Sequence, residues 1–169
     1  MLKIRAFEDD DLQLLNKWLN KKYIKKWFEV PDICTIDDWL HEVKNRNGEF
    51  RWLSYFIVQS DNCPVGFCTY YKCADAKEDW YGNISLDGVY SIDYLIGEEE
   101  YLGKGIGKKM IAKLIEMIFE HENAKRIIVQ PDKNNKASSS VLLSNGFIFE
   151  DNIHGITKKE YCMRTDRIL

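Results

Sequence analysis

The residues best suited to chemistry in this chain, by type and spacing, are 102–109, with the sequence LGKGIGKK. Glycines occupy positions 103, 105 and 107, and an apolar-periodic run typical of a helix begins at Met110. The preceding residues, 89–96, have the branched and aromatic composition of a strand. A glycine turn between a strand and a helix start allows backbone N–H groups to face an anion, and the helix N-terminus adds partial positive charge. The stretch therefore predicts a site for an anion such as a phosphate.

Two common nucleotide sites need a different spacing. A dinucleotide fold needs Gly-x-Gly-x-x-Gly and an acid at the end of the next strand. Here the third glycine comes one residue early, and the next strand ends in Gln130. A P-loop needs Gly-x-x-x-x-Gly-Lys-Ser/Thr, which residues 103–109 do not provide. Both sites are excluded, and a glycine cluster that only turns the chain stays as an alternative.

The elements that must position this turn follow from the hydrophobic pattern. We expect strands at residues 2–7, 51–59, 64–72, 89–96, 126–130, 147–150 and within 158–164. We expect helices from residue 12 to 19, 23 to 28, 108 to 122 and 137 to 143, and one that Thr35 caps and that continues through Val43. Residues 74–86 are polar and predict a loop, and Gly66 inside a strand indicates a bulge or the close approach of another backbone. The order of these elements predicts an α/β fold with a mixed sheet in one domain, residues 1–169.

Composition narrows the class of protein. The chain has 169 residues, 45% hydrophobic and 30% charged, with a net charge of −3, which speaks against general nucleic-acid binding. Its apolar runs are too short for a membrane span and no signal peptide is visible, so we expect a cytoplasmic protein. The five cysteines and three histidines show no metal-ligand spacing, so we expect neither a metal nor a disulfide framework.

Acidic residues are concentrated before the glycine stretch. Residues 75–100 hold eight carboxylates against one base, Lys77. Such a segment is a solvated loop or an electrostatic funnel for a polycation. Within it, Asp93 lies inside an otherwise apolar strand, where a carboxylate needs a partner. That partner is either a basic residue of the protein or the ammonium group of a substrate.

A second motif, Asn135…Ser138…Leu142…Gly146-Phe147, follows the glycine stretch. Together with residues 93–107 it resembles the GNAT superfamily of acetyl-CoA-dependent N-acetyltransferases, whose pyrophosphate loop reads Arg/Gln-x-x-Gly-x-Gly/Ala. Gly105 and Gly107 match this loop, and Leu102 replaces the usual Arg or Gln. Looser matches over most of the chain, among them Trp18-Leu19-Asn20 and residues 64–67, resemble the aminoglycoside 6′-N-acetyltransferases.

Two positions depart from that branch. Gln130 stands where an acid commonly helps to bind the cationic drug, and Leu142 stands where a Tyr often serves as candidate proton donor to the leaving thiolate. The run 135–142 instead resembles ribosomal-protein N-terminal acetyltransferases.

The resemblance implies a GNAT fold, with a twisted, mostly antiparallel sheet whose central strands, 89–96 and 126–130, splay apart. It implies that a main-chain N–H of residues 94–97 binds the oxyanion of the reaction. The implied acetyl-CoA contacts are Leu95, Ile96, Gly97, Leu102, Gly103, Lys104, Gly105, Ile106, Gly107, Lys108, Asn135 and Ser138. For the acceptor amine, Asp93 is the expected catalytic carboxylate, and the other expected contacts are Trp27, Trp80, Tyr81, Glu98, Glu99 and Gln130.

We therefore expect an enzyme that moves acetyl from acetyl-CoA to a primary amine of a polycationic small molecule, with an aminoglycoside 6′-amine as the leading acceptor and antibiotic resistance as the implied role. No metal, nucleic acid or membrane is expected to take part, and the chain is expected to be a monomer or a homodimer. One alternative is acetylation of protein N-termini. Another is a non-catalytic acyl-CoA-binding module, which the absence of a Tyr at position 142 motivates.

Overall fold

The computed structural model describes residues 1–149 and 161–164, the latter as backbone. By contacts the chain divides into two compact units. Unit 1 comprises Met1–Thr69 and Asp93–Gly107, and unit 2 comprises Tyr70–Ile92 and Lys108–Leu169. The predicted single domain of residues 1–169 stays a prediction.

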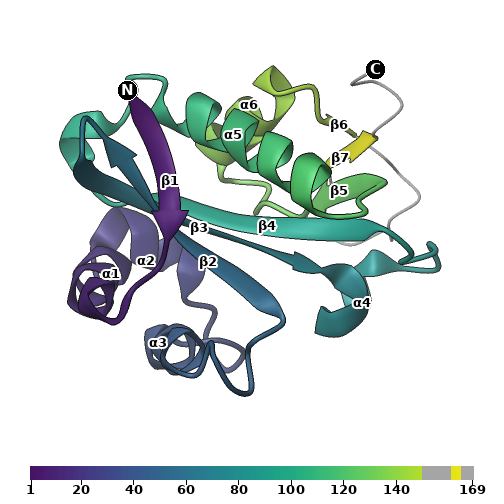
Figure 1. The fold of residues 1–169 in the computed structure, drawn as a ribbon, viewed down its shortest axis with the longest axis horizontal. Helices are drawn as coiled ribbons and strands as arrows, with labels where there is room; N and C mark the ends of the chain where they lie inside the picture. The colour runs from purple at the N-terminus through teal and green to yellow at the C-terminus, as the bar shows by residue number, and fades with distance from the viewer. Residues whose placement is uncertain (150–160, 165–169) are drawn as a thin grey trace. The chain divides into compact units, whose positions relative to one another are not determined.

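Unit 1 begins with β1 (Leu2–Ala6), which pairs antiparallel with β2 (Leu53–Ser60), Leu2 lying opposite Ser60. Between these strands the chain forms η1 (Asp9–Asp11), α1 (Leu12–Leu19), α2 (Lys22–Phe28) and α3 (Ile36–Lys44), and the three α-helices lie to one side of β1 and β2 (Figure 1). The unit also holds the first part of β3 (Cys63–Lys72), the end of β4 (Val89–Ile96), and η3 (Glu99–Tyr101). Its strand order is β1-β2-β3-β4.

Two sequence signals of unit 1 are confirmed. The side chain of Thr35 accepts a hydrogen bond from the Asp38 N–H at 3.1 Å, and the Thr35 N–H donates to Asp38 at 2.7 Å, a capping box that starts α3. Asp61 and Asn62 have φ angles of 49° and 68°, as a two-residue hairpin turn requires, and they join β2 to β3.

Unit 2 contains the end of β3, the start of β4, α4 (Cys73–Ala76), η2 (Asp79–Tyr81) and most of α5 (Ile106–His121). It continues with β5 (Arg126–Val129), α6 (Lys136–Ser144), β6 (Ile148–Phe149) and β7 (Tyr161–Arg164). β4 and β5 are parallel, whereas β7 pairs antiparallel with both β5 and β6. The strand order is β3-β4-β5-β7-β6.

The α/β class and the mixed sheet flanked by helices are thus confirmed. The described register pairs β5 with residues 89–91 of β4, and β4 then continues to Ile96, as expected for a splayed pair. The loop prediction for residues 74–86 is wrong in part, because α4 and η2 form there. Part of the last predicted strand, residues 158–160, lies outside the described residues, as does Glu150.

The fully buried side chains supply each unit with its core. In unit 1 they include Leu15, Trp18, Leu19, Ile57 and Phe67, and in unit 2 Tyr90, Ile92, Met110, Ile111 and Leu114. The described cysteines, Cys34, Cys63, Cys68 and Cys73, form no disulfide with one another. Within the residues that the structure describes, no helix is both long and apolar enough to cross a membrane.

Candidate active site

The glycine loop takes up the conformation that its sequence predicts. Residues 102–105 are exposed, and Gly103 and Gly105 have φ angles of 71° and 75°, in the left-handed region that favours glycine. α5 starts at Ile106, two residues before the predicted Lys108, because the left-handed turn at Gly105 leads directly into the helix. Gly107 and Lys108 therefore lie in the first turn of α5.

The space around this loop suits a bulky anion. A Cβ atom built on Gly103 or Gly105 would meet no heavy atom within 4 Å, so the backbone is open to a ligand. The 16-residue helix α5 follows immediately and contributes the partial charge of its N-terminus. The Lys104 ammonium lies 5.7 Å from the ring centroid of Tyr101, and Lys108 is exposed. These features agree with the predicted phosphate site, and the assignment of the loop to a particular ligand stays a prediction.

The end of β4 packs closely against β3. A Cβ atom on Gly66 would lie 2.5 Å from the Leu95 carbonyl oxygen, which confirms the predicted close approach of another backbone. The Gly97 N–H donates to the Val65 carbonyl at 2.8 Å. The expectation of an oxyanion donor among residues 94–97 is therefore wrong for Gly97, since its N–H already has a partner in the sheet.

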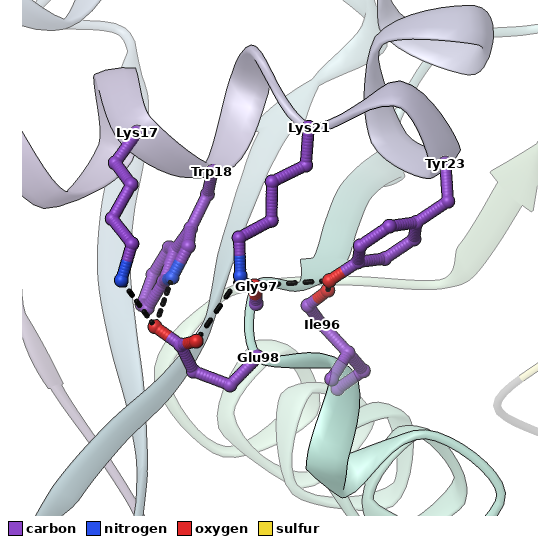
Figure 2. A network of polar contacts seen from close by, with 7 residues as sticks. All are labelled: Lys17, Trp18, Lys21, Tyr23, Ile96, Gly97 and Glu98. Atoms are coloured by element: carbon purple, nitrogen blue, oxygen red, sulfur yellow. Dashed lines mark hydrogen bonds and ion pairs between the residues drawn. The ribbon is translucent and has the colours of Figure 1, made fainter.

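The turn after β4 is bound to the helices α1 and α2 (Figure 2). Glu98 accepts hydrogen bonds from the Trp18 indole at 2.8 Å and from the Lys21 ammonium at 3.1 Å, and Lys17 lies 3.4 Å away. The pKa of Glu98 is lowered, mainly by the hydrogen bond from Trp18 and further by Lys21 and Lys17, whereas burial acts to raise it. The predicted substrate contact Glu98 thus has its carboxylate bound within the protein, and a role toward the acceptor stays a prediction.

Asp93 lies half-buried near the end of β4, beside Tyr55. Burial raises the pKa of Tyr55, and so do the charge of Glu42, the hydrogen bond to it and the charge of Asp93, whereas the charge of Arg46 lowers it. The Tyr55 hydroxyl donates to Glu42 at 2.9 Å. Two carboxylates, one from β4 and one from α3, therefore act on the same phenol.

The other predicted acceptor contacts of unit 1 lie apart from this pair in the sequence. Trp27 is half-buried in α2, and the Lys26 ammonium lies 4.8 Å from the centroid of its ring. Glu99 is exposed at the start of η3. Neither observation tests a contact with substrate, so both stay predictions.

Two of the residues predicted in unit 2 lie next to each other. The rings of Trp80 and Tyr81 have centroids 4.6 Å apart. Tyr81 is only 2% exposed and packs with Cys73, Val89 and Ile128, while Trp80 is partly buried beside that cluster. Tyr81 thus serves the hydrophobic core of unit 2, and a role toward a substrate stays a prediction.

The remaining predicted residues, Gln130, Asn135 and Ser138, lie between the end of β5 and the first turns of α6 in the sequence. Asn135 is the N-cap of this helix, and its side chain accepts a hydrogen bond from the Ser138 N–H at 3.1 Å. Gln130 is half-buried directly after β5. Leu142 is fully buried, so the position where relatives often carry a Tyr belongs to the core here. The capping bond gives Asn135 a structural function that the sequence prediction missed.

The prediction also missed Lys21, Tyr23 and Glu42. The contacts of Lys21 and Tyr23 with the turn after β4 join residues 73 to 77 positions apart, which no local pattern indicates. Glu42 is one acid among several on an amphipathic helix. No signal in the sequence distinguishes these three from solvated residues.

A hollow of about 340 Å³ in unit 1 has a different character. The residues that the structure describes around it include Arg46 and Arg51 but no carboxylate, beside Phe7, Asn47, Leu53 and Tyr55. Its charge does not suit a polycationic amine. In the described part of the chain, no group of three or more His, Cys, Asp or Glu residues is placed to hold a metal.

The chain matches known acetyltransferases. The family model "Acetyltransferase (GNAT) domain" matches residues 8–154. Two curated relatives, both aminoglycoside N(6′)-acetyltransferases type 1, from Klebsiella pneumoniae and Serratia marcescens, are each 25% identical over 137 residues. The match covers 78% of this chain and 66% of each relative, slightly less than two thirds of their length.

Solved structures have the same fold. An aminoglycoside 6′-N-acetyltransferase in complex with ribostamycin and coenzyme A superposes with a TM-score of 0.84 at 20% identity, over 99% of this chain and 95% of that one. A spermidine N-acetyltransferase from Vibrio cholerae in complex with CoA and spermine gives a TM-score of 0.73 at 19% identity, over 98% and 96% of the two chains. At these identities the likeness establishes the fold.

Proposed function

Because the chain belongs to the family of acetyltransferases with a GNAT domain, we propose that it transfers an acetyl group from acetyl-CoA to a primary amine of a polycationic small molecule. The observation that carries the proposal is the open glycine loop, with Gly103 and Gly105 in the left-handed region and α5 starting at the next residue. Acetyl-CoA supplies the thioester and, through its pyrophosphate, the anion that this loop suits. A cytoplasmic location and a role in antibiotic resistance belong to the same proposal.

The protein holds and orients the two reactants for direct attack. The amine must lose a proton before it attacks, because an ammonium group has no lone pair. Asp93, half-buried near the end of β4, binds the acceptor ammonium and takes up the proton directly or through water. A main-chain N–H at the end of β4 stabilises the oxyanion. The attack forms the C–N bond, the tetrahedral intermediate then breaks the C–S bond, and CoA leaves as its thiolate toward solvent, without a covalent intermediate on the protein.

The leading acceptor is an aminoglycoside 6′-amine. Relatives and fold neighbours are named for aminoglycosides, and residues 75–100 hold eight carboxylates against one base, which suits an acceptor with several ammonium groups. A linear polyamine has the same chemistry, and a fold neighbour binds spermine. Acetylation of protein N-termini is the second candidate, favoured by the sequence of residues 135–142.

Steady-state acetylation separates these acceptors. We expect turnover with kanamycin-type aminoglycosides, less with polyamines, and none with N-terminal peptides. Efficient turnover of peptides alone would overturn the leading acceptor. Binding of acetyl-CoA without turnover of any amine would indicate a non-catalytic module instead.

The role of Asp93 has its own test. Asp93→Asn should lower kcat/KM roughly 100-fold or more, the usual contribution of a positioned acid or base, while acetyl-CoA affinity stays normal. Asp37→Asn, at an exposed position in the first turn of α3, is the matched control and should keep full activity. A rate unchanged by Asp93→Asn would remove Asp93 from the active site.

A further inference from the structure

The turn that follows β4 is held by side chains of the α1–α2 segment at two successive carbonyl groups (Figure 2). Tyr23, in the first turn of α2, directs its hydroxyl to the carbonyl oxygens of Ile96 at 3.0 Å and of Gly97 at 2.9 Å. Lys21, the residue just before α2, donates to the Gly97 carbonyl at 2.7 Å. These contacts lie where the proposed function places the acetyl thioester.

The peptide group between Ile96 and Gly97 is fixed at both ends. Its N–H, from Gly97, donates to Val65 of β3 at 2.8 Å, and its C=O accepts from Tyr23. In a planar trans peptide these two groups point in opposite directions, so β3 and α2 hold it from opposite sides. This peptide cannot rotate without losing a hydrogen bond at each end.

The next peptide group is oriented by the same two side chains. Its carbonyl oxygen, from Gly97, accepts hydrogen bonds from Lys21 and Tyr23. Its N–H, from Glu98, must therefore point away from α2. The Lys21 ammonium also donates to the Glu98 carboxylate, which accepts a further hydrogen bond from the indole of the fully buried Trp18. The α1–α2 segment thereby determines which way the backbone donors after β4 point.

The protonation of the Tyr23 phenol agrees with its role as a hydrogen-bond donor. Burial, followed by the charges of Glu99 and Glu98, raises the pKa of Tyr23 to about 12. The phenol therefore stays protonated at neutral pH and donates its hydrogen to the carbonyl groups.

From this geometry we infer that Lys21 and Tyr23 are positioning residues for the acetyl donor. They orient the two peptide groups at the end of β4 so that the backbone N–H of Glu98, which points away from α2, is directed at the thioester carbonyl. The inference rests on the proposed function and adds to it, because it links the helices α1 and α2 to the acetyl-transfer step. Neither side chain needs to touch the reacting atoms.

The test compares Lys21→Met and Tyr23→Phe with two matched controls. Lys17→Met removes a second lysine near the same carboxylate, but Lys17 is 61% exposed, and its ammonium has one polar contact with the described residues, Glu98 at 3.4 Å. Tyr70→Phe removes a phenol hydroxyl that donates to Glu122 within unit 2.

The first readout is the ¹³C shift of the carbonyl of [1-¹³C]acetyl-CoA at saturation, which reports polarisation of the thioester independently of any acceptor. The others are the affinity for acetyl-CoA and, with an acceptor that the wild type turns over, kcat.

We expect wild type and both controls to shift the bound carbonyl resonance equally. Lys21→Met should lose most of this shift and lower kcat about tenfold, whereas Tyr23→Phe should lower kcat about threefold. In both variants the affinity for acetyl-CoA should stay within a factor of about three of wild type. Wild-type shift and kcat in both variants, with acetyl-CoA bound, would overturn the inference and leave the proposed function intact. If the wild type fails to bind acetyl-CoA, the proposed function itself is wrong and the inference falls with it.

Discussion

Glycines only a few residues apart in this chain are required for opposite reasons. A Cβ atom on Gly97 would lie 2.1 Å from the ring of Trp18, although the φ angle of Gly97 is not positive. Gly103 and Gly105 have φ angles of 71° and 75°, yet a Cβ on either would meet no heavy atom within 4 Å. Gly97 is needed for space, whereas the other two are needed for backbone conformation.

This difference separates a turn that packs against the protein from a loop that is open to a proposed ligand. At Gly97 the protein itself fills the volume that a side chain would take, so a substitution should cost stability. At Gly103 and Gly105 the volume is open to solvent, so a substitution that tolerates the left-handed region should affect mainly a ligand. The following predictions test this division, beginning with the largest expected effect.

The largest effect is expected for Gly105→Asp, measured as acetyl-CoA affinity. A carboxylate at this position would face the pyrophosphate, and a juxtaposition of like charges costs several kcal/mol, so the affinity should fall roughly 100-fold or more. The free energy of unfolding should fall by only about 1–2 kcal/mol, the cost of a left-handed conformation for a residue with a side chain. Isothermal titration calorimetry and urea denaturation measure the two quantities.

Gly105→Asn is the matched control, because Asn has nearly the same shape, tolerates the left-handed region and carries no charge. It should keep much more of the affinity than Gly105→Asp. Affinity retained in the aspartate variant would contradict the assignment of this loop to the pyrophosphate.

The second effect is expected for Gly97→Ala, measured as the free energy of unfolding. The added methyl group must displace the fully buried Trp18, and overpacking of this kind costs about 1–3 kcal/mol. Gly48→Ala is the control, since its Cβ would meet only the Asn45 carbonyl oxygen at an ordinary 3.7 Å. If the two variants unfold at the same urea concentration, Gly97 is not required for space.

The conformation of the glycine loop was predictable from the sequence because its requirements are local. The spacing of Gly103 and Gly105 after a strand and before a helix already indicates an anion site. The approach of another backbone to Gly66 was predictable for the same reason, since a glycine inside a strand commonly marks one. Such signals depend only on the conformation and the neighbours of a short segment.

The turn that packs against the protein was not predictable, because it depends on contacts between distant parts of the chain. Trp18 falls within the helix predicted for residues 12–19, but its indole bond to Glu98 joins residues 80 positions apart. In the sequence Glu98 is one acid in a run of three, and the run beside the predicted acetyl site indicates a contact with the acceptor amine. Charge density in a sequence shows where carboxylates are, but not which of them the fold has already paired.

The smallest effect is expected for the paired charge of Glu98, measured as the pH dependence of stability. Hydrogen bonds and charges from Trp18, Lys21 and Lys17 lower the pKa of Glu98 in the folded protein. Its stabilising contribution is therefore fully present above the unfolded pKa of about 4.3 and is lost as pH falls through the lower folded value.

Glu98→Gln should lower the free energy of unfolding at pH 7 by less than about 1 kcal/mol, because the carboxylate keeps some contact with solvent. The difference from wild type should shrink below pH 4, whereas Glu99→Gln, at the exposed neighbouring position, should follow the wild-type curve throughout. Urea denaturation from pH 3 to pH 7 measures this, and equal curves for Glu98→Gln and wild type would show that the ion pair does not stabilise the turn after β4.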